Sequence, residues 1–243
     1  VHPERQVIKG IDIEVRRGEV VGIAGLMGAG RTEFAMSLFG RSWGRHITGE
    51  VSLEGKKIDV SSVEKAVNQG IAYATEDRKT YGLNLIDHIK HNITLANLKG
   101  VSRGTVIDDL RELDVANDYR GKTNIRSSSV YQKTGNLSGG NQQKVVLAKW
   151  LAMQPKVMIF DEPTRGIDVG AKSEIYRLMR GLADAGVAVM MISSDMEEVI
   201  GVSDRVAVMH EGRIAGVLDR DRCSEENILS LAVGRQVETA GDA

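Results

Sequence analysis

Residues 25–32 read Gly25-Leu26-Met27-Gly28-Ala29-Gly30-Arg31-Thr32 and carry the clearest signal in the chain. They follow the apolar run 20–24, which predicts a strand buried on both faces, and they precede a predicted helix. A glycine-rich turn in this context is typical of a phosphate-binding loop, because glycines let backbone N–H groups turn around an anion and the helix start adds partial positive charge. The residues expected to contact the phosphates are Gly25, Met27, Gly28, Ala29, Gly30, Arg31 and Thr32.

The loop departs from the phosphate-binding pattern at one position. Arg31 stands where the pattern has the lysine that reaches the β- and γ-phosphates. Arginine keeps the charge but is bulkier, planar and differently aimed, so the exchange is not conservative. Thr32 keeps the hydroxyl that is expected to bind Mg²⁺. A chance glycine-rich turn stays the alternative interpretation of this stretch taken alone.

Two carboxylates follow a second apolar strand. Asp161 and Glu162 come directly after the run 157–160, at the carboxyl end of a predicted parallel strand. Asp161 is expected to bind Mg²⁺ through water, and Glu162 to orient and deprotonate an attacking water. An apolar run followed by Asp-Glu is weak evidence alone, but it gains weight beside a phosphate loop earlier in the chain.

A third segment predicts a second anion-binding helix start. Residues 137–143 read Leu-Ser-Gly-Gly-Asn-Gln-Gln, in which Ser138 can cap a helix. Gly139 and Gly140 would let a phosphate approach the exposed N–H groups at that helix start. Taken alone, the segment fits an ordinary capped helix better.

The remaining hydrophobic patterns predict an α/β domain. Ile11, Ile13 and Val15 alternate with polar residues, which predicts a half-buried strand, and residues 51–58 predict an antiparallel hairpin. In the last third, short strands are separated by a helix, which implies parallel pairing with right-handed crossovers. The strands expected there cover residues 157–160, 187–192 and 206–209.

The segment 83–136 has a different character. Its apolar residues recur at helical spacing, so a helical insertion is favoured over a loop-rich connection. The residues that suggest two helix faces are Leu95 and Leu98 on one, and Ile107, Leu110 and Leu113 on the other.

Composition excludes several classes of protein. The 243 residues include 32 basic and 33 acidic side chains, and a net charge of −1 argues against a nucleic-acid-binding protein. The single cysteine, Cys223, excludes an internal disulfide and favours a reducing compartment. No run approaches the roughly 18 apolar residues that would span a bilayer, and no export signal is evident. The start at Val1 suggests a piece of something longer.

The order of the three motifs resembles the ATP-binding cassette (ABC) family. A phosphate loop is followed by Leu-Ser-Gly-Gly-Asn-Gln-Gln, then by Phe-Asp-Glu-Pro-Thr, and Asp168 falls in the loop that in this family faces a partner cassette. The resemblance implies a P-loop NTPase fold with a mostly parallel core sheet, an antiparallel β subdomain and an inserted helical subdomain. It implies one nucleotide-binding domain over 1–243, divided into a core (1–82 and 137–225), a helical subdomain (about 83–136) and a tail (226–243).

A narrower resemblance points to one subgroup. The phosphate loop, Glu76-Asp77-Arg78-Lys79 and the run 161–172 look like the fused double-cassette ATPases of bacterial monosaccharide importers of the ribose, galactoside, xylose or mixed-sugar type. Within them, this chain resembles the second cassette. ATP and Mg²⁺ are then the expected cofactors. The expected partners are the first cassette, a membrane permease and, indirectly, a periplasmic sugar-binding protein, at the cytoplasmic side of the inner membrane.

Two further positions depart from the family pattern. Glu76 stands where cassettes usually carry a glutamine that senses Mg²⁺ and the transporter, and Ser194 stands in place of the switch histidine. A serine hydroxyl is too short to replace an imidazole between γ-phosphate and water. Since one transition-state hydrogen-bond donor is worth about 10²–10³ in rate, the serine in place of the histidine together with Arg31 in place of the lysine predicts slow turnover, even with Glu162 present.

The resemblance therefore predicts an asymmetric pair of sites. This cassette's own loop would hold ATP in a slow site, with Glu162 as the catalytic residue and Ser194 as a degenerate switch. Its signature segment would complete the site of the first cassette. The nucleotide contacts expected from the signature side are Ser138, Gly139, Gly140, Asn141, Gln142 and Asp168.

Two other functions stay open. A soluble ABC ATPase acting on ribosomes or DNA predicts a basic surface or a long coiled-coil insertion, which net charge and the short middle segment disfavour. A regulatory nucleotide-binding module without turnover is favoured by Arg31 and Ser194 and opposed by Glu162. His88 and His91 are interpreted as surface or packing residues, because no cysteine or carboxylate cluster completes a metal set.

Overall fold

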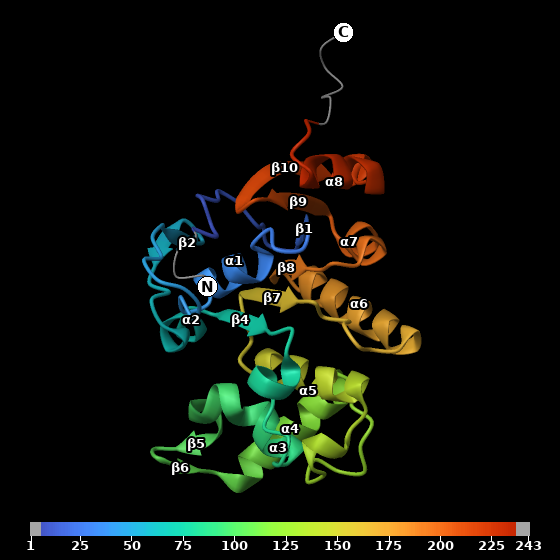
Figure 1. Cartoon of the computed structure of the whole chain (residues 1–243). Coiled ribbons are helices and arrows are strands. Elements are labelled where there is room, and N and C mark those ends of the chain that lie inside the picture. Colours follow the sequence, from blue (N-terminus) through green and yellow to red (C-terminus); the bar gives the residue numbers. More distant parts are fainter. Residues whose placement is uncertain (1–5, 237–243) are drawn as a thin grey trace.

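A six-stranded sheet forms the centre of the molecule in the structure, a computed structural model that describes residues 6–236 (Figure 1). The strand order is β10-β9-β1-β8-β7-β4, and neighbouring strands run parallel except β10 against β9. The strands are β1 (Val20–Gly25), β4 (Ile71–Ala74), β7 (Val157–Asp161), β8 (Ala188–Ile192), β9 (Arg205–His210) and β10 (Arg213–Asp219).

Apolar runs form the inner strands because helices cover both faces of a parallel sheet. Every residue of β4 and β8 is buried, and β1 is buried up to its last residue. The predicted α/β class with a mostly parallel sheet is confirmed. The helices of this part are α1 (Arg31–Leu38), α2 (Val63–Asn68), α5 (Gly139–Leu151), α6 (Val169–Asp184), α7 (Met196–Val202) and α8 (Glu225–Ala232), with a 3₁₀ turn η4 (Arg220–Arg222) before α8.

A second group of helices lies at the opposite end of the molecule from α8 (Figure 1). Helix α5 contacts α3, α4 and β4, so it joins this group to the sheet. The elements are α3 (Ile89–Thr94), the 3₁₀ helix η2 (Leu95–Val101), the hairpin β5 (Ser102–Arg103) and β6 (Val106–Ile107), α4 (Asp109–Lys122) and the 3₁₀ turn η3 (Thr134–Asn136).

The carboxyl ends of three central strands meet at one edge of the sheet. In the ladder, β1 and β7 flank β8, and Asp161 at the end of β7 is paired with Ile192 at the end of β8. The glycine-rich loop leaves β1 at the same edge. Ligands of open parallel sheets bind outside this edge, so the fold brings together segments distant in the chain.

Some local predictions are wrong. The hairpin over 51–58 is confirmed as β2 (Val51–Leu53) and β3 (Lys56–Ile58), but residues 11–15 form no strand. Their side chains do alternate between half-buried and exposed, yet no neighbouring strand supplies a hydrogen-bond ladder there.

The predicted helix faces in the middle segment are also partly wrong. Ile107 lies in strand β6 rather than on a helix with Leu110, and Leu110 is 73% exposed. Leu95 and Leu98 are exposed as well, whereas Leu113 is half-buried and packs against the core, so only this end of the second predicted stripe faces the core. None of the helices within residues 6–236 has the length and apolar character needed to cross a membrane.

Candidate functional site

The glycine-rich loop connects β1 to α1 in the geometry that a phosphate-binding loop needs. Gly25, Gly28 and Gly30 adopt φ values of 151°, 80° and 99°, which side chains disfavour. A Cβ on Gly25 would lie 2.5 Å from the carbonyl oxygen of Met209, whereas nothing lies within 4 Å of the Cβ position of Gly28. The loop is therefore packed from behind by β9 and is open in front, where its backbone can meet an anion.

A cavity of about 810 Å³ lies in front of this loop. It brings together the loop, the catalytic candidate Glu162, and the two family departures Glu76 and Ser194. Its lining residues are Met27, Gly28, Ala29, Gly30, Arg31, Thr32, Glu33, Glu76, Glu162, Thr164, Arg165, Gly166, Ile167, Lys172, Ser194, Asp195 and Glu198.

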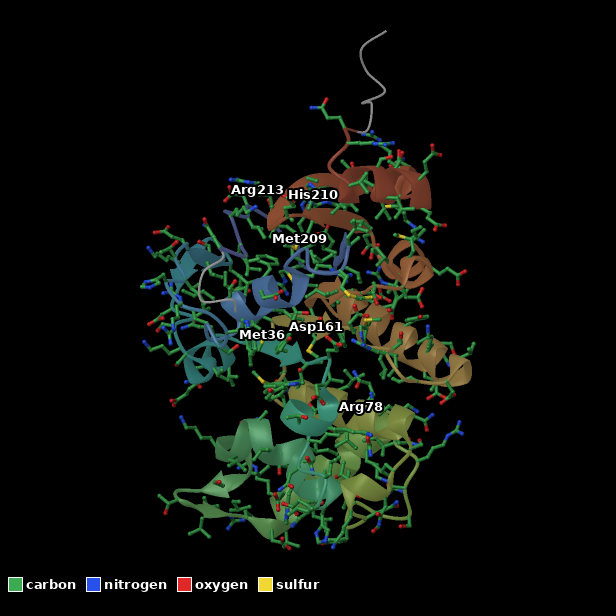
Figure 2. All side chains as sticks on the ribbon, in the orientation of Figure 1. Met36, Arg78, Asp161, Met209, His210 and Arg213 are labelled. Atoms are coloured by element: carbon green, nitrogen blue, oxygen red, sulfur yellow. The ribbon has the colours of Figure 1, made fainter. Side chains whose placement is uncertain are left out.

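The metal candidates Thr32 and Asp161 lie side by side beneath the loop. The Thr32 hydroxyl donates to Asp161 Oδ1 at 3.3 Å, and the Tyr73 hydroxyl donates to Asp161 Oδ2 at 2.7 Å. Burial raises the pKa of Asp161, which has no exposed surface and is labelled at the centre of the molecule in Figure 2. A hydroxyl and a carboxylate oxygen in contact fit the hard-oxygen coordination of Mg²⁺.

Arg31 points to the catalytic candidate Glu162. Its Nη1 donates to the carbonyl oxygen of Ser193 at 2.5 Å, and its Nη2 lies 3.8 Å from Glu162 Oε1. Ser194 Oγ donates to the other carboxylate oxygen, Glu162 Oε2, at 2.9 Å. Both side chains of the Arg31–Glu162 pair are nearly buried, at 12% and 11% exposure. Arg31 and Ser194, two of the three residues that depart from the family pattern, thus contact both oxygens of Glu162.

Glu76 lines the same cavity. Its carboxylate forms an ion pair with Arg165, which lies in the loop after β7. The family resemblance predicts Glu76 near the nucleotide, and in the structure Glu76 lines the cavity.

The signature segment lies outside the cavity. Ser138 caps α5, where its hydroxyl oxygen accepts from the backbone N–H of Asn141 and from the Asn141 side-chain amide, at 3.4 and 2.9 Å. Gln142 is buried and donates to the carbonyl oxygen of Leu137 at 3.2 Å. The Cβ position of Gly140 is 3.9 Å from Asp168 Oδ1, so the signature start and the loop before α6 adjoin.

Comparison with known proteins shows which family the chain belongs to. The family model described as ABC transporter matches residues 8–165. The chain belongs to this family. An L-arabinose transport ATP-binding protein of Geobacillus stearothermophilus is 53% identical to this ABC transporter cassette over 95% of the chain and 45% of the relative. A xylose import ATP-binding protein of Thermoanaerobacter pseudethanolicus is 48% identical over 96% of the chain and 46% of the relative.

The chain spans about half the length of the curated relatives it matches. The fold of the ABC cassette is also shared with a dimeric ATP-binding cassette in a post-hydrolysis state bound to ADP and Pi. That structure superposes with a TM-score of 0.73 at 21% identity, covering 88% of this chain and 90% of the other.

The structure of the cassette adds residues that sequence analysis missed. Tyr73 reaches Asp161 from β4, which pairs with β7, and no motif marks it. Lys172 lines the cavity and donates from Nζ to Asp195 at 2.7 Å. No spacing pattern in the sequence points to either residue. Tyr73 reaches the site because β4 pairs with β7, and Lys172 because it lies near the start of α6.

One expectation about histidines needs correction. A carboxylate does accompany His88 and His91, since Asp87 Oδ1 lies 2.7 Å from His91 Nδ1. The three residues offer ligand atoms within 4.8 Å of one another. Asp87 Oδ1 also accepts from the backbone N–H of His88 at 2.8 Å, so this cluster is held together by its own hydrogen bonds.

Proposed function

We propose that this chain is an ATP-binding and ATP-hydrolysing cassette that energises sugar import through a membrane permease. One observation carries the proposal: the glycine loop, Thr32 and Glu162 line a single cavity of about 810 Å³, and buried Asp161 contacts the Thr32 hydroxyl behind its wall. The names of the relatives, which are arabinose and xylose transport proteins, support the sugar class.

The phosphates would be held mainly by backbone groups. The donors would be backbone N–H groups between Gly28 and Thr32, since Gly28 leaves room for an anion and α1 starts at Arg31. The Ala29 N–H already donates to Leu26 O at 3.0 Å, so it belongs to the internal turn of the loop. Mg²⁺ would be held by Thr32 and, through water, by Asp161, and it would draw charge from the terminal phosphates when bound. This binding machinery does not depend on the lysine that Arg31 replaces.

The cassette's own site would turn over slowly. A general base must be oriented toward the attacking water, whereas the contacts with Arg31 and Ser194 fix the orientation of the Glu162 carboxylate toward those two side chains. The Ser194 hydroxyl sits against Glu162 and is too short to bridge γ-phosphate and water. The same contacts favour the second candidate function, a nucleotide-binding module that regulates without hydrolysis.

The signature segment would complete the site of a partner cassette. Ser138 and Asp168 are exposed and lie on adjoining segments outside this chain's own cavity, so a second molecule can reach them. The partner in this proposal is the first cassette of a fused double-cassette protein, of which this chain is the second. The contacts would come from Ser138, Gly139, Gly140, Asn141 and Asp168. Gln142, which the sequence also predicts as a contact, is buried and would hold the segment in place through Leu137 O.

The assembly would sit on the cytoplasmic side of the inner membrane, bound to the permease. In this proposal the nucleotide core covers 1–82 and 137–225 and the helical subdomain covers 83–136, with Glu76 at the boundary facing the permease. The part of the proposed tail 226–243 that lies within the described residues begins in α8. Sugar specificity would reside in the permease and the periplasmic binding protein.

The test is steady-state ATPase activity of the full-length protein assembled with its permease. Ser138→Ala should lower activity, because it removes a donor at the partner's site. Ser173→Ala is the matched control, since Ser173 is an exposed serine that donates within its own helix to Gly170 O. Glu162→Gln should leave most activity in place, because this site contributes little. Full activity with Ser138→Ala, or its loss with Glu162→Gln, would overturn the asymmetric arrangement.

A further inference from the structure

The segment Glu76–Lys79 holds an arginine that the proposed function has not used. Asp77 caps the π-helical turn η1 (Arg78–Gly82), and its carboxylate accepts from the backbone N–H groups of Lys79 and Thr80 at 3.1 and 3.0 Å. The other end of the turn is fixed by Lys149 of α5, which donates from Nζ to Gly82 O at 2.7 Å. Single π-helical turns occur frequently at functional sites.

The Arg78 guanidinium lies at the start of the signature helix. Its Nη2 is 2.9 Å from the position that a Cβ on Gly139 would take, so the absence of a side chain at Gly139 makes room for it. Its Nη1 donates to Arg165 O at 3.2 Å. Figure 2 labels Arg78 where the sheet-bearing part of the molecule meets the group of α3, α4 and α5.

The charge of Arg78 is compensated only in part among the described residues, by the nearby Asp77 carboxylate. Its Nε is buried without a hydrogen-bond partner, and no carboxylate forms a salt bridge with it anywhere in residues 6–236. The nearby carboxylates are engaged elsewhere, Glu76 with Arg165 and Asp77 with the backbone of its own turn. Partial burial lowers the pKa of Arg78, and the nearby Asp77 carboxylate opposes this shift without cancelling it.

We propose that Arg78 binds the terminal phosphoryl group of the nucleoside triphosphate held by the partner cassette, next to the backbone amides of Gly139 and Gly140. This inference rests on the proposed function, in which the signature segment faces the partner's nucleotide. Guanidinium groups match phosphate oxygens with two parallel N–H donors, and a helix start adds further N–H groups. Arg78 thus acts in trans as a further catalytic residue of the partner's site.

A purely structural role makes a different prediction. If Arg78 only holds η1, Arg165 and α5 together, its replacement should impair folding and should weaken the binding of ATP and ADP alike. As a ligand of the terminal phosphate, it affects ATP and its hydrolysis but not ADP. Lysine at position 78 keeps the charge but lacks the two parallel N–H donors of the guanidinium group. We therefore expect Arg78→Lys to restore only part of the activity that Arg78→Ala loses.

The experiment uses the full-length protein assembled with its permease and compares Arg78→Ala, Arg78→Lys and the control Lys79→Ala. Lys79 lies in the same turn and is exposed, and only its backbone N–H is used by Asp77. The measurements are kcat/KM for ATP, the inhibition constant of ADP and the melting temperature. We expect Arg78→Ala to lower kcat/KM by about 10²-fold, the loss of one transition-state donor, with ADP inhibition and melting temperature unchanged. Lys79→Ala stays at the wild-type level.

Comparison with Ser138→Ala separates the two proposals. Loss of activity in Ser138→Ala but wild-type kinetics in Arg78→Ala would overturn the role of Arg78 and leave the proposed function standing. Wild-type kinetics in both variants would overturn the trans arrangement itself. If Arg78→Ala weakens ADP as much as ATP or lowers the melting temperature, and Arg78→Lys restores both folding and kcat, Arg78 has a purely structural role and the inference is wrong.

Discussion

Replacing Arg31 with lysine is expected to strengthen the binding of Mg-ATP to this cassette about tenfold. To contact a phosphate, the guanidinium must leave the carbonyl oxygen of Ser193, at 2.5 Å, and the carboxylate of Glu162, at 3.8 Å. Lysine ends in a single ammonium group and has no planar fork, so it cannot hold both groups in the same way. With lysine at position 31, a smaller part of the free energy of Mg-ATP binding is needed to separate this side chain from Ser193 and Glu162.

The magnitude follows from the geometry of the pair. At 3.8 Å and an effective dielectric constant of about 20, the Coulomb attraction between the two charges is roughly 4 kcal/mol. After exchange with water, a hydrogen bond to a charged group contributes a net of about 1.5–3 kcal/mol. The lower end of that range corresponds to about a factor of ten in affinity, and it is the appropriate one because lysine can still be attracted to Glu162.

The assay is a calorimetric titration of Mg-ATP into the wild type, Arg31→Lys, Glu162→Gln and the double variant. Because both single changes loosen the same contact, their effects on affinity should not add. Ser194→Ala is the control, since it removes the other partner of Glu162 without touching Arg31. Affinity that is unchanged or weaker in Arg31→Lys, with additive effects in the double variant, would refute the reasoning.

Three further changes test the surroundings of the site. Tyr73→Phe removes a donor at 2.7 Å from buried Asp161 and should lower the free energy of unfolding by about 1–3 kcal/mol in denaturant titrations; an unchanged midpoint would contradict the contact. Burial raises the pKa of Asp161, so the free energy of unfolding should fall as pH rises through that pKa. Because Asp161→Asn removes this buried charge, it should raise the melting temperature at pH 7. The same change should abolish Mg²⁺-dependent ATP binding. Burial lowers the pKa of Lys149 to about 8, so wild-type stability should rise between pH 8 and 10 as the ammonium loses its proton; Lys149→Met should remove that rise, and parallel curves would disprove it.

Much of the sheet could be predicted because buried parallel strands are simple apolar runs. The segments that became β1, β7 and β8 each stand out as short hydrophobic stretches next to turn residues. The site loops could be located for a related reason: they follow the carboxyl ends of those strands. The prediction of a strand over residues 11–15 is wrong because it rests only on the alternation of apolar and polar side chains. A strand also requires a neighbouring strand to pair with, and the alternation carries no information about one.

The contacts within the site could not be predicted, because they depend on side-chain direction. Arg31 was expected to reach phosphates and instead contacts Glu162, which is brought near by the β7–β8 pairing. The Tyr73–Asp161 contact requires β4 to lie beside β7, an order that no local pattern encodes. Arg78 was part of a recognisable sequence segment, but its position at Gly139 follows from the turn that Asp77 caps.

The central claim is that backbone amides of residues 28–32 hold a triphosphate. Titrating Mg-ATP into this cassette by calorimetry, with Gly28→Val as the variant that fills the open side of the loop, tests it most directly. We expect one nucleotide bound per chain for the wild type and no binding for the variant at the same concentrations. An absence of heat from the folded wild type, together with a nucleotide-soaked crystal in which the Arg31 guanidinium fills the pocket, would contradict the account.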